Sequence, residues 1–111
     1  MDKDEPIRLK TLWKNQRYFV SEMEKRGFRL VSKETPIVPL LIGDEALCDV
    51  ISFNLREQGF HIDRVKFPGV PKNKSRLRFI LNAGHKTNQI DRLVAIMSEL
   101  AERYPQVINA D

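Results

Sequence analysis

Two arginines alternate with apolar residues in the stretch Arg76–Leu81, which reads RLRFIL. Successive side chains of a β-strand point to opposite faces, so Arg76 and Arg78 would share one face, whereas the leucines and the phenylalanine would share the other. A guanidinium group presents a planar fork of donors that fits a carboxylate or a phosphate. The arginine face could therefore bind an anion, pair with a carboxylate of the same chain, or remain solvated, as most exposed charge does.

A basic loop, Pro68–Ser75, leads into this strand and is bounded by proline and glycine. Lys72 and Lys74 of the loop extend the basic cluster of the two arginines. No aromatic residue interleaves with these cations, which argues against a stacking platform for single-stranded nucleic acid. The net charge of +4, without a run of five like charges, permits anionic partners, but it does not predict a nucleic-acid partner.

The other residues that could carry chemistry fit structural roles. His61 and His85 are the only histidines, and neither has a second metal ligand at a useful spacing, so no metal site is predicted. His85 stands at an expected corner between a strand and a helix, where a hydrogen-bonded turn residue is typical. The carboxylates of Asp44, Glu45 and Asp49 fit the start and exposed face of a helix better than a pair of catalytic acids.

Length and composition indicate one domain over residues 1–111, with 41% apolar and 31% charged residues. Cys48 is the only cysteine, which excludes an internal disulfide and suits a reducing compartment. We interpret it as a small core residue. The longest apolar run, 37–43, is too short to span a membrane. The charged N-terminus shows no apolar signal-peptide region, so we predict a cytoplasmic protein.

Apolar periodicity predicts helices over 5–26, 45–58 and 87–104, with Asp44 as a cap of the second and Gly27 and Gly59 ending the first two. Pro105 should stop the third helix, and the tail 106–111 should fray. The residues expected to face inward are Leu9, Leu12, Trp13, Gln16, Phe19, Val20 and Met23, then Leu47, Val50, Ile51 and Leu55, then Ile90, Leu93, Val94, Met97, Leu100 and Ala101.

Strands are predicted over 37–42 and 76–81, with a weaker one over 60–67 and a possible start at 28–31. Pro39 lacks an N–H group, so we expect one missing hydrogen bond in its ladder. The fold class is α/β with two layers, in which a small, mostly antiparallel sheet of three to four strands carries about three helices on one face. The opposite face, with Arg76, Arg78 and Ile80, remains open and is a candidate interface.

Three segments resemble a known family. TPIVPLLIGD (35–44), LREQGF (55–60) and FPGVPKNKSRLRFILNAGHKTNQID (67–91) are similar to the C-terminal small domain of the α-oxoamine synthases. The leading helix, with LWKNQRYF (12–19), resembles the helix that enters this domain. These are fold-type I pyridoxal-phosphate enzymes of the aminotransferase class I/II superfamily, and they condense an amino acid with an acyl-CoA. Members include 8-amino-7-oxononanoate synthase, glycine C-acetyltransferase, 5-aminolevulinate synthase and serine palmitoyltransferase.

The resemblance implies roles for individual residues. Arg78, at the second arginine of the family's RLR pattern, would bind the carboxylate of the amino-acid substrate. The loop that borders the acyl-CoA entrance and closes over the site would be Pro68, Gly69, Val70 and Pro71. Lys72, Lys74 and Arg76 would attract the phosphates of CoA. Two departures weaken the corner after the strand. Lys86 and Asn88 replace the family's usual threonine and glutamate, so Thr87 is expected to cap the last helix, and Gly84 replaces an alanine.

The resemblance also implies what these residues lack. The lysine that forms a Schiff base with pyridoxal phosphate belongs to the family's large domain, to which nothing in this chain corresponds. We therefore expect no catalytic residue, no bound cofactor and no activity in these 111 residues alone. The implied partners are a large domain or partner subunit, the amino acid and the acyl-CoA, in an enzyme that is a homodimer when complete. The alternative is a catalytically silent binding or regulatory module that docks through its open sheet face. The genomic context would separate the two.

Overall fold

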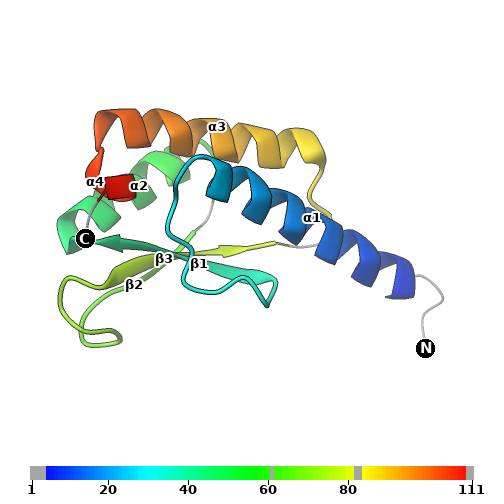
Figure 1. The fold of residues 1–111 in the computed structure, drawn as a ribbon, viewed down its shortest axis with the longest axis horizontal. Coiled ribbons are helices and arrows are strands. Elements are labelled where there is room, and N and C mark those ends of the chain that lie inside the picture. The colour runs from blue at the N-terminus through cyan, green and yellow to red at the C-terminus, as the bar shows by residue number, and fades with distance from the viewer. Residues whose placement is uncertain (1–4, 61, 82–83, 110–111) are drawn as a thin grey trace.

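A computed structural model of the chain describes residues 5–60, 62–81 and 84–109 (Figure 1). The elements in chain order are α1 (Glu5–Lys25), β1 (Ile37–Gly43), α2 (Glu45–Glu57), β2 (Asp63–Val65), β3 (Ser75–Ile80), α3 (Thr87–Arg103) and α4 (Gln106–Asn109). Within the described residues, no helix is both long enough and apolar enough to cross a membrane.

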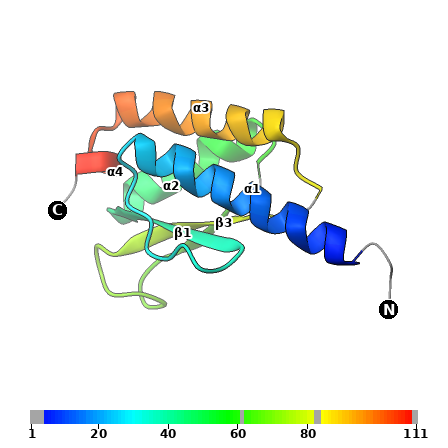
Figure 2. The same cartoon turned by 45° about the vertical axis from the view of Figure 1, so that its right-hand side comes forward.

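The strands form an antiparallel sheet in the order β1-β3-β2, so β3 is central. The three long helices all lie on the same side of this sheet, as Figures 1 and 2 show. The predicted two-layer α/β fold is therefore confirmed. The weak strand expected over 60–67 is reduced to β2, and the segment 28–31 contributes a single bridge, between Leu30 and Leu40.

β3 shows the predicted alternation of faces. Leu77 and Phe79 are buried under the helices, with Phe79 only 1% exposed, whereas Arg78 and Ile80 point to the open side. The Phe79 ring packs against Phe19 of α1, with 5.1 Å between the ring centroids and 44° between the planes. Because Leu77 and Phe79 are packed on the helix side of β3, they hold its backbone in place, and Arg78 projects from this backbone on the open side.

Pro39 lies within β1, opposite Arg78 of β3. Its carbonyl accepts a hydrogen bond from Val31 N–H (2.8 Å), and Leu41 N–H donates to the Arg29 carbonyl (3.0 Å). Backbone groups of alternate residues point to the same side of a strand, so the Pro39 nitrogen also points toward this outer segment. The missing hydrogen bond predicted at Pro39 therefore falls on the side away from β3.

α1 has fully buried apolar side chains only in its second half, although Leu12 in its first half is partly buried against the core. Phe19 and Met23 are fully buried, but Leu9, which periodicity predicts to face inward, is 55% exposed. Figures 1 and 2 show that the N-terminal half of α1 extends beyond the end of the sheet, which explains this exposure. The other end is closed as predicted, because Gly27 adopts a φ of +85° and Phe28 N–H reaches the Met23 carbonyl (3.2 Å).

α2 turns a slightly different face to the core than the sequence predicts. Cys48 and Ser52 are buried beside Leu47, Ile51 and Leu55, a spacing that keeps one helical face. Val50, predicted to face inward, lies on the outer side and is partly exposed. The structure places Asp44 at the N-cap position with extended backbone, as predicted, but its side chain makes no capping hydrogen bond.

The Cys48 thiol is fully buried, which confirms its interpretation as a core residue. Burial, with a smaller contribution from the nearby Asp49 carboxylate, raises the pKa of this thiol to about 11. At pH 8 only about one thiol in a thousand would then be ionised, and the thiolate is the reactive form. We expect a disulfide reagent such as Ellman's to leave the folded chain unmodified and to titrate one thiol after denaturation in urea. Rapid stoichiometric modification without urea would contradict this placement.

The predicted cap of α3 is wrong by one residue. Lys86 occupies the N-cap position, and Thr87 is the first helical residue. The Gln89 side chain, at the third helical position, accepts a hydrogen bond from Lys86 N–H through Oε1 (2.9 Å). This is the reciprocal half of a capping box, and Gln89 supplies it without requiring a hydroxyl at the cap.

The tail is ordered over 106–109, where the sequence predicts fraying; residues 110–111 lie outside the described part. α3 ends before Pro105 as predicted, and the chain then forms α4. Val107 of α4 is fully buried, and its N–H donates to the Tyr104 carbonyl (3.0 Å). Burial of Val107, with Ile108 packed against the core beside it, holds α4 in place.

Candidate functional site

The open face of the sheet is built from alternate residues of all three strands. Cross-strand pairing places Arg78 between Pro39 of β1 and Asp63 of β2. The next row has Arg76 between Leu41 and Val65, and the row at the other end pairs Ile37 with Ile80. Arginines thus occupy the centre of a face whose β1 side is apolar and whose β2 side carries one carboxylate.

Arg78 and Asp63 form an ion pair across the two strands. The distance between Arg78 Nη2 and Asp63 Oδ2 is 2.9 Å, and the side chains are 44% and 53% exposed. A pair this exposed contributes about 0.2–1 kcal/mol to stability, because water screens it and both side chains lose freedom. From its residues alone, the arginine face could hold an anion, a carboxylate of the chain or water. In the structure, Arg78 holds a carboxylate of the chain.

Sequence reasoning missed Asp63. The residue lies in a short strand whose alternation is irregular, and it is 15 residues away from Arg78. The signal that could have revealed it is the hairpin register. β2 and β3 are consecutive antiparallel strands, and pairing Val65 with Arg76 places Asp63 directly opposite Arg78.

Arg76 is held differently. Its side chain is half-buried, and its Nε donates to the Lys74 carbonyl at the end of the preceding loop (3.3 Å). Arg76 is therefore associated with the loop, whereas Arg78 is directed across β2. The two arginines share a face, as predicted, but they have separate partners.

The loop between β2 and β3 contains the residues to which the resemblance assigns a gate. Gly69 N–H donates to the Lys66 carbonyl (2.8 Å), and Lys74 N–H donates to the Pro71 carbonyl (3.1 Å). A Cβ atom at Gly69 would lie 3.2 Å from the Lys66 carbonyl oxygen, so this turn leaves little room for a side chain.

A cation–aromatic contact joins the start of this loop to a residue farther along it. The Lys72 ammonium lies 5.2 Å from the centre of the Phe67 ring, which is itself half-exposed, and the peptide bond from Phe67 to Pro68 is cis. The contact between Lys72 and Phe67 folds the loop back on itself, and Lys72, Lys74 and Arg76 follow one another along the chain into β3.

A second acidic residue, Asp49 of α2, binds two cations that are not on the open face, Arg64 of β2 and Lys66 just after it. Its Oδ1 lies 2.6 Å from Arg64 Nη1 and 3.2 Å from Lys66 Nζ. Partial burial raises the pKa of the Asp49 carboxyl, but the hydrogen bonds from Lys66 and Arg64 outweigh it and lower that pKa below its ordinary value. Arg64 and Lys66 are thus engaged with α2 rather than with the arginine face.

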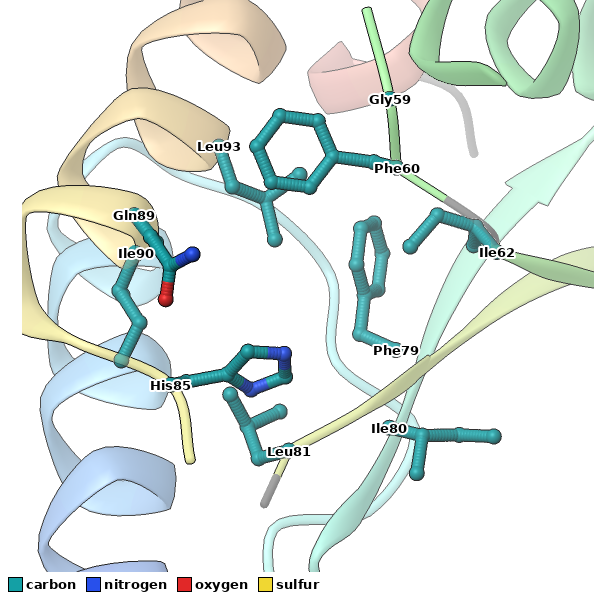
Figure 3. Close-up of a pocket in the computed structure, with 10 residues that line it drawn as sticks. All are labelled: Gly59, Phe60, Ile62, Phe79, Ile80, Leu81, His85, Gln89, Ile90 and Leu93. Atoms are coloured by element: carbon teal, nitrogen blue, oxygen red, sulfur yellow. The ribbon is translucent and has the colours of Figure 1, made fainter. Parts of the chain in front are cut away.

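A pocket of about 350 Å³ lies at the end of the sheet, between the start of α3 and the segment after α2 (Figure 3). The side chains that line it are mostly apolar, and the polar groups that point into it are the His85 ring and the Gln89 amide. The lining residues that the structure describes include no arginine, lysine or acid, so this pocket differs in chemistry from the arginine face.

His85 is tied into the fold through its backbone, because its carbonyl accepts a hydrogen bond from Asn15 Nδ2 of α1 (2.9 Å). This agrees with the hydrogen-bonded turn residue that the sequence predicts. His61 lies outside the described residues. Among the residues that are described, no group of three or more His, Cys, Asp or Glu side chains gathers in a way that could hold a metal ion.

Comparison with known proteins identifies the family. Residues 3–97 match the family described as aminotransferase class I and II. The 8-amino-7-oxononanoate synthase of Bacillus pumilus (strain SAFR-032) is 42% identical over 100 residues, which are 90% of this chain and 26% of that protein. A serine palmitoyltransferase structure from Sphingomonas wittichii shares the fold, with a TM-score of 0.80 and 21% identity over 87% of this chain and 25% of that one. Another, with a pyridoxal-phosphate internal aldimine, has a TM-score of 0.80 and 21% identity, covering 88% and 25%.

The chain therefore belongs to the aminotransferase class I and II family. Its similarity to an 8-amino-7-oxononanoate synthase agrees with the sequence resemblance to the α-oxoamine synthases. The chain spans about a quarter of the length of the relatives that it matches. One of these solved structures contains pyridoxal phosphate as an internal aldimine.

The described residues do not by themselves fit pyridoxal phosphate. A Schiff-base lysine has to be positioned and shielded from water, but every lysine among the described residues is exposed or half-buried. We expect that titrating the isolated chain with pyridoxal phosphate gives no stoichiometric internal-aldimine absorbance band. A band of one equivalent that disappears when a single lysine is replaced would contradict this expectation.

Proposed function

We propose that this chain is the substrate-clamping and gating part of a pyridoxal-phosphate-dependent acyltransferase that condenses an amino acid with an acyl-CoA. The observation that carries the proposal is the placement of Arg78. It stands on the open face of the central strand, where the buried side chains of Leu77 and Phe79 fix its backbone. The family and the similarity to 8-amino-7-oxononanoate synthase support the reaction class.

In this proposal Arg78 binds the carboxylate of the amino acid. Its guanidinium already engages a carboxylate, that of Asp63, at 2.9 Å, so a carboxylate can reach the position that the function requires. The open face is uncovered in this chain, and we infer that the remaining three-quarters of the enzyme covers it and supplies the cofactor lysine. Excluding water there would strengthen the interaction between the arginine and the substrate.

The loop Pro68–Pro71 and the cations beyond it would serve the second substrate. Lys72, Lys74 and Arg76 place three positive charges in succession at the mouth of the arginine face, and CoA is polyanionic. The hydrogen bond from Arg76 to the Lys74 carbonyl links the loop to β3. A movement of the loop on acyl-CoA binding would therefore shift Arg76, which is two residues from Arg78.

A chimera tests the proposal. The Bacillus pumilus 8-amino-7-oxononanoate synthase, with its matching segment of about a quarter replaced by this chain, should fold, bind pyridoxal phosphate and show a spectral change on adding an amino acid. The unmodified relative is the control for cofactor loading. A chimera that holds the cofactor as the relative does, but whose spectrum does not respond to amino acids, would contradict the clamping role.

A further inference from the structure

The Asp63 carboxylate is paired with the guanidinium of Arg78, the group that binds the substrate carboxylate in the proposed function. The two residues are directly paired across β2 and β3, and their side chains lie on the same open face. Within the described residues, the Asp63 carboxylate is the only hydrogen-bond acceptor of the Arg78 side chain, through Nη2. The neighbours of Arg78 on the open face include Pro39, its partner in β1, and Arg76, two residues earlier in β3, and neither brings a negative charge.

The contact has the properties of a replaceable partner. Both side chains are close to half exposed, and Asp63 lies on a strand of three residues at the edge of the sheet, whereas Arg78 lies on the central strand. Asp63 can therefore leave without disturbing the core, while Arg78 stays in place. An incoming carboxylate and the Asp63 carboxylate repel each other, and both need the same fork of donors.

We propose that Asp63 is an internal competitor of the substrate carboxylate and thereby sets the affinity of Arg78 for it, an inference that rests on the proposed function. In the empty site Asp63 neutralises the guanidinium. A ligand with a free carboxylate displaces Asp63, and a ligand without one leaves the pair intact. Asp63 thus lowers the affinity of Arg78 for every ligand carboxylate.

The test uses the chimera described above, with L-alanine as the simplest chiral amino acid and L-alaninamide as the same molecule without a carboxylate. Dissociation constants are measured by spectral titration for the parent chimera, Asp63→Asn, Arg78→Ala and the double variant. Asp49→Asn is the matched control, because it removes the same charge from a similarly exposed carboxylate whose two cationic partners do not include Arg78.

Asp63→Asn should tighten L-alanine binding by about two- to fivefold, the range that an exposed ion pair allows. It should leave L-alaninamide binding unchanged, and its effect on L-alanine should vanish when Arg78 is alanine. Asp49→Asn should leave the dissociation constants of both ligands unchanged.

Other results overturn the inference. Weaker L-alanine binding in Asp63→Asn would make Asp63 a residue that positions Arg78. No change, or equal tightening with Asp49→Asn, would remove any specific role. If Arg78→Ala itself leaves L-alanine binding intact, the proposed function fails and this inference fails with it. A failure confined to Asp63 leaves the clamping role of Arg78 standing.

Discussion

Arg78→Ala in the chimera is expected to weaken amino-acid binding by about 100-fold, on the order of 3 kcal/mol. An arginine–carboxylate pair that is shielded from water contributes roughly 2–5 kcal/mol, part of which is the penalty for leaving the substrate charge unpaired. The effect should be far larger than that of Asp63→Asn, because Arg78 supplies the attraction and Asp63 only competes for it. Spectral titration with L-alanine measures the loss directly.

Two further variants show whether the fork or merely the charge is required. Arg78→Lys should recover little affinity, since an ammonium group cannot reproduce two parallel N–H donors. Arg76→Ala is the matched control. Arg76 lies on the same face as Arg78 but about 7 Å away along the strand, too far for both to bind one small carboxylate. The Arg76 side chain is directed to the loop instead. It should act on acyl-CoA affinity or on stability. Loss of amino-acid binding in Arg76→Ala but not in Arg78→Ala would reverse the assignment.

Local periodicity was sufficient to predict most of the fold. The alternation in β3 and the three-and-four spacing of the helices depend only on which side chains share a face, and a buried face is a requirement of every element. Leu77, Phe79 and the second half of α1 are buried as predicted. Periodicity does not predict how much of each helix is covered by the rest of the fold. Leu9 has the spacing of a buried residue, but it is exposed because it lies where α1 extends beyond the sheet.

The errors arise where distant parts of the chain decide the outcome. Fraying was predicted for the tail, but Val107 is buried in a core that residues far away in the sequence form. The cap of α3 depended on Gln89 reaching back to Lys86, a choice among neighbouring polar residues that spacing alone does not settle. Asp63 became a partner of Arg78 through the hairpin register, which is a tertiary property.

The candidate site was predictable only as a set of possibilities. Residue chemistry restricted the arginine face to an anion, a carboxylate of the chain or water, and the family resemblance selected Arg78 over Arg76. The structure adds that the two arginines have different partners, which gives a physical reason to separate their roles. It also shows that the Asp63 carboxylate pairs with Arg78, and this follows neither from the motif nor from composition.

Phe79→Ala should produce the largest loss of stability among the single substitutions considered, about 3–5 kcal/mol in the free energy of unfolding. The ring is 1% exposed and packs on Phe19, so its removal leaves a cavity between the sheet and α1. Urea unfolding, followed by far-ultraviolet circular dichroism, measures the change. Phe79→Leu, which should cost about 1–2 kcal/mol, gives a measurable value if the alanine variant does not fold.

The neighbouring residue is the matched control. Ile80→Ala removes a similar apolar side chain from the same strand, but Ile80 is 49% exposed on the open face, so the expected loss is below about 1 kcal/mol. The comparison bears on function as well as on stability. A shift of β3 by one residue would bury Ile80, expose Phe79 and turn Arg78 toward the helices. A larger loss for Ile80→Ala than for Phe79→Ala would therefore reject both the register and the clamp, whereas the expected order fixes Arg78 on the open face.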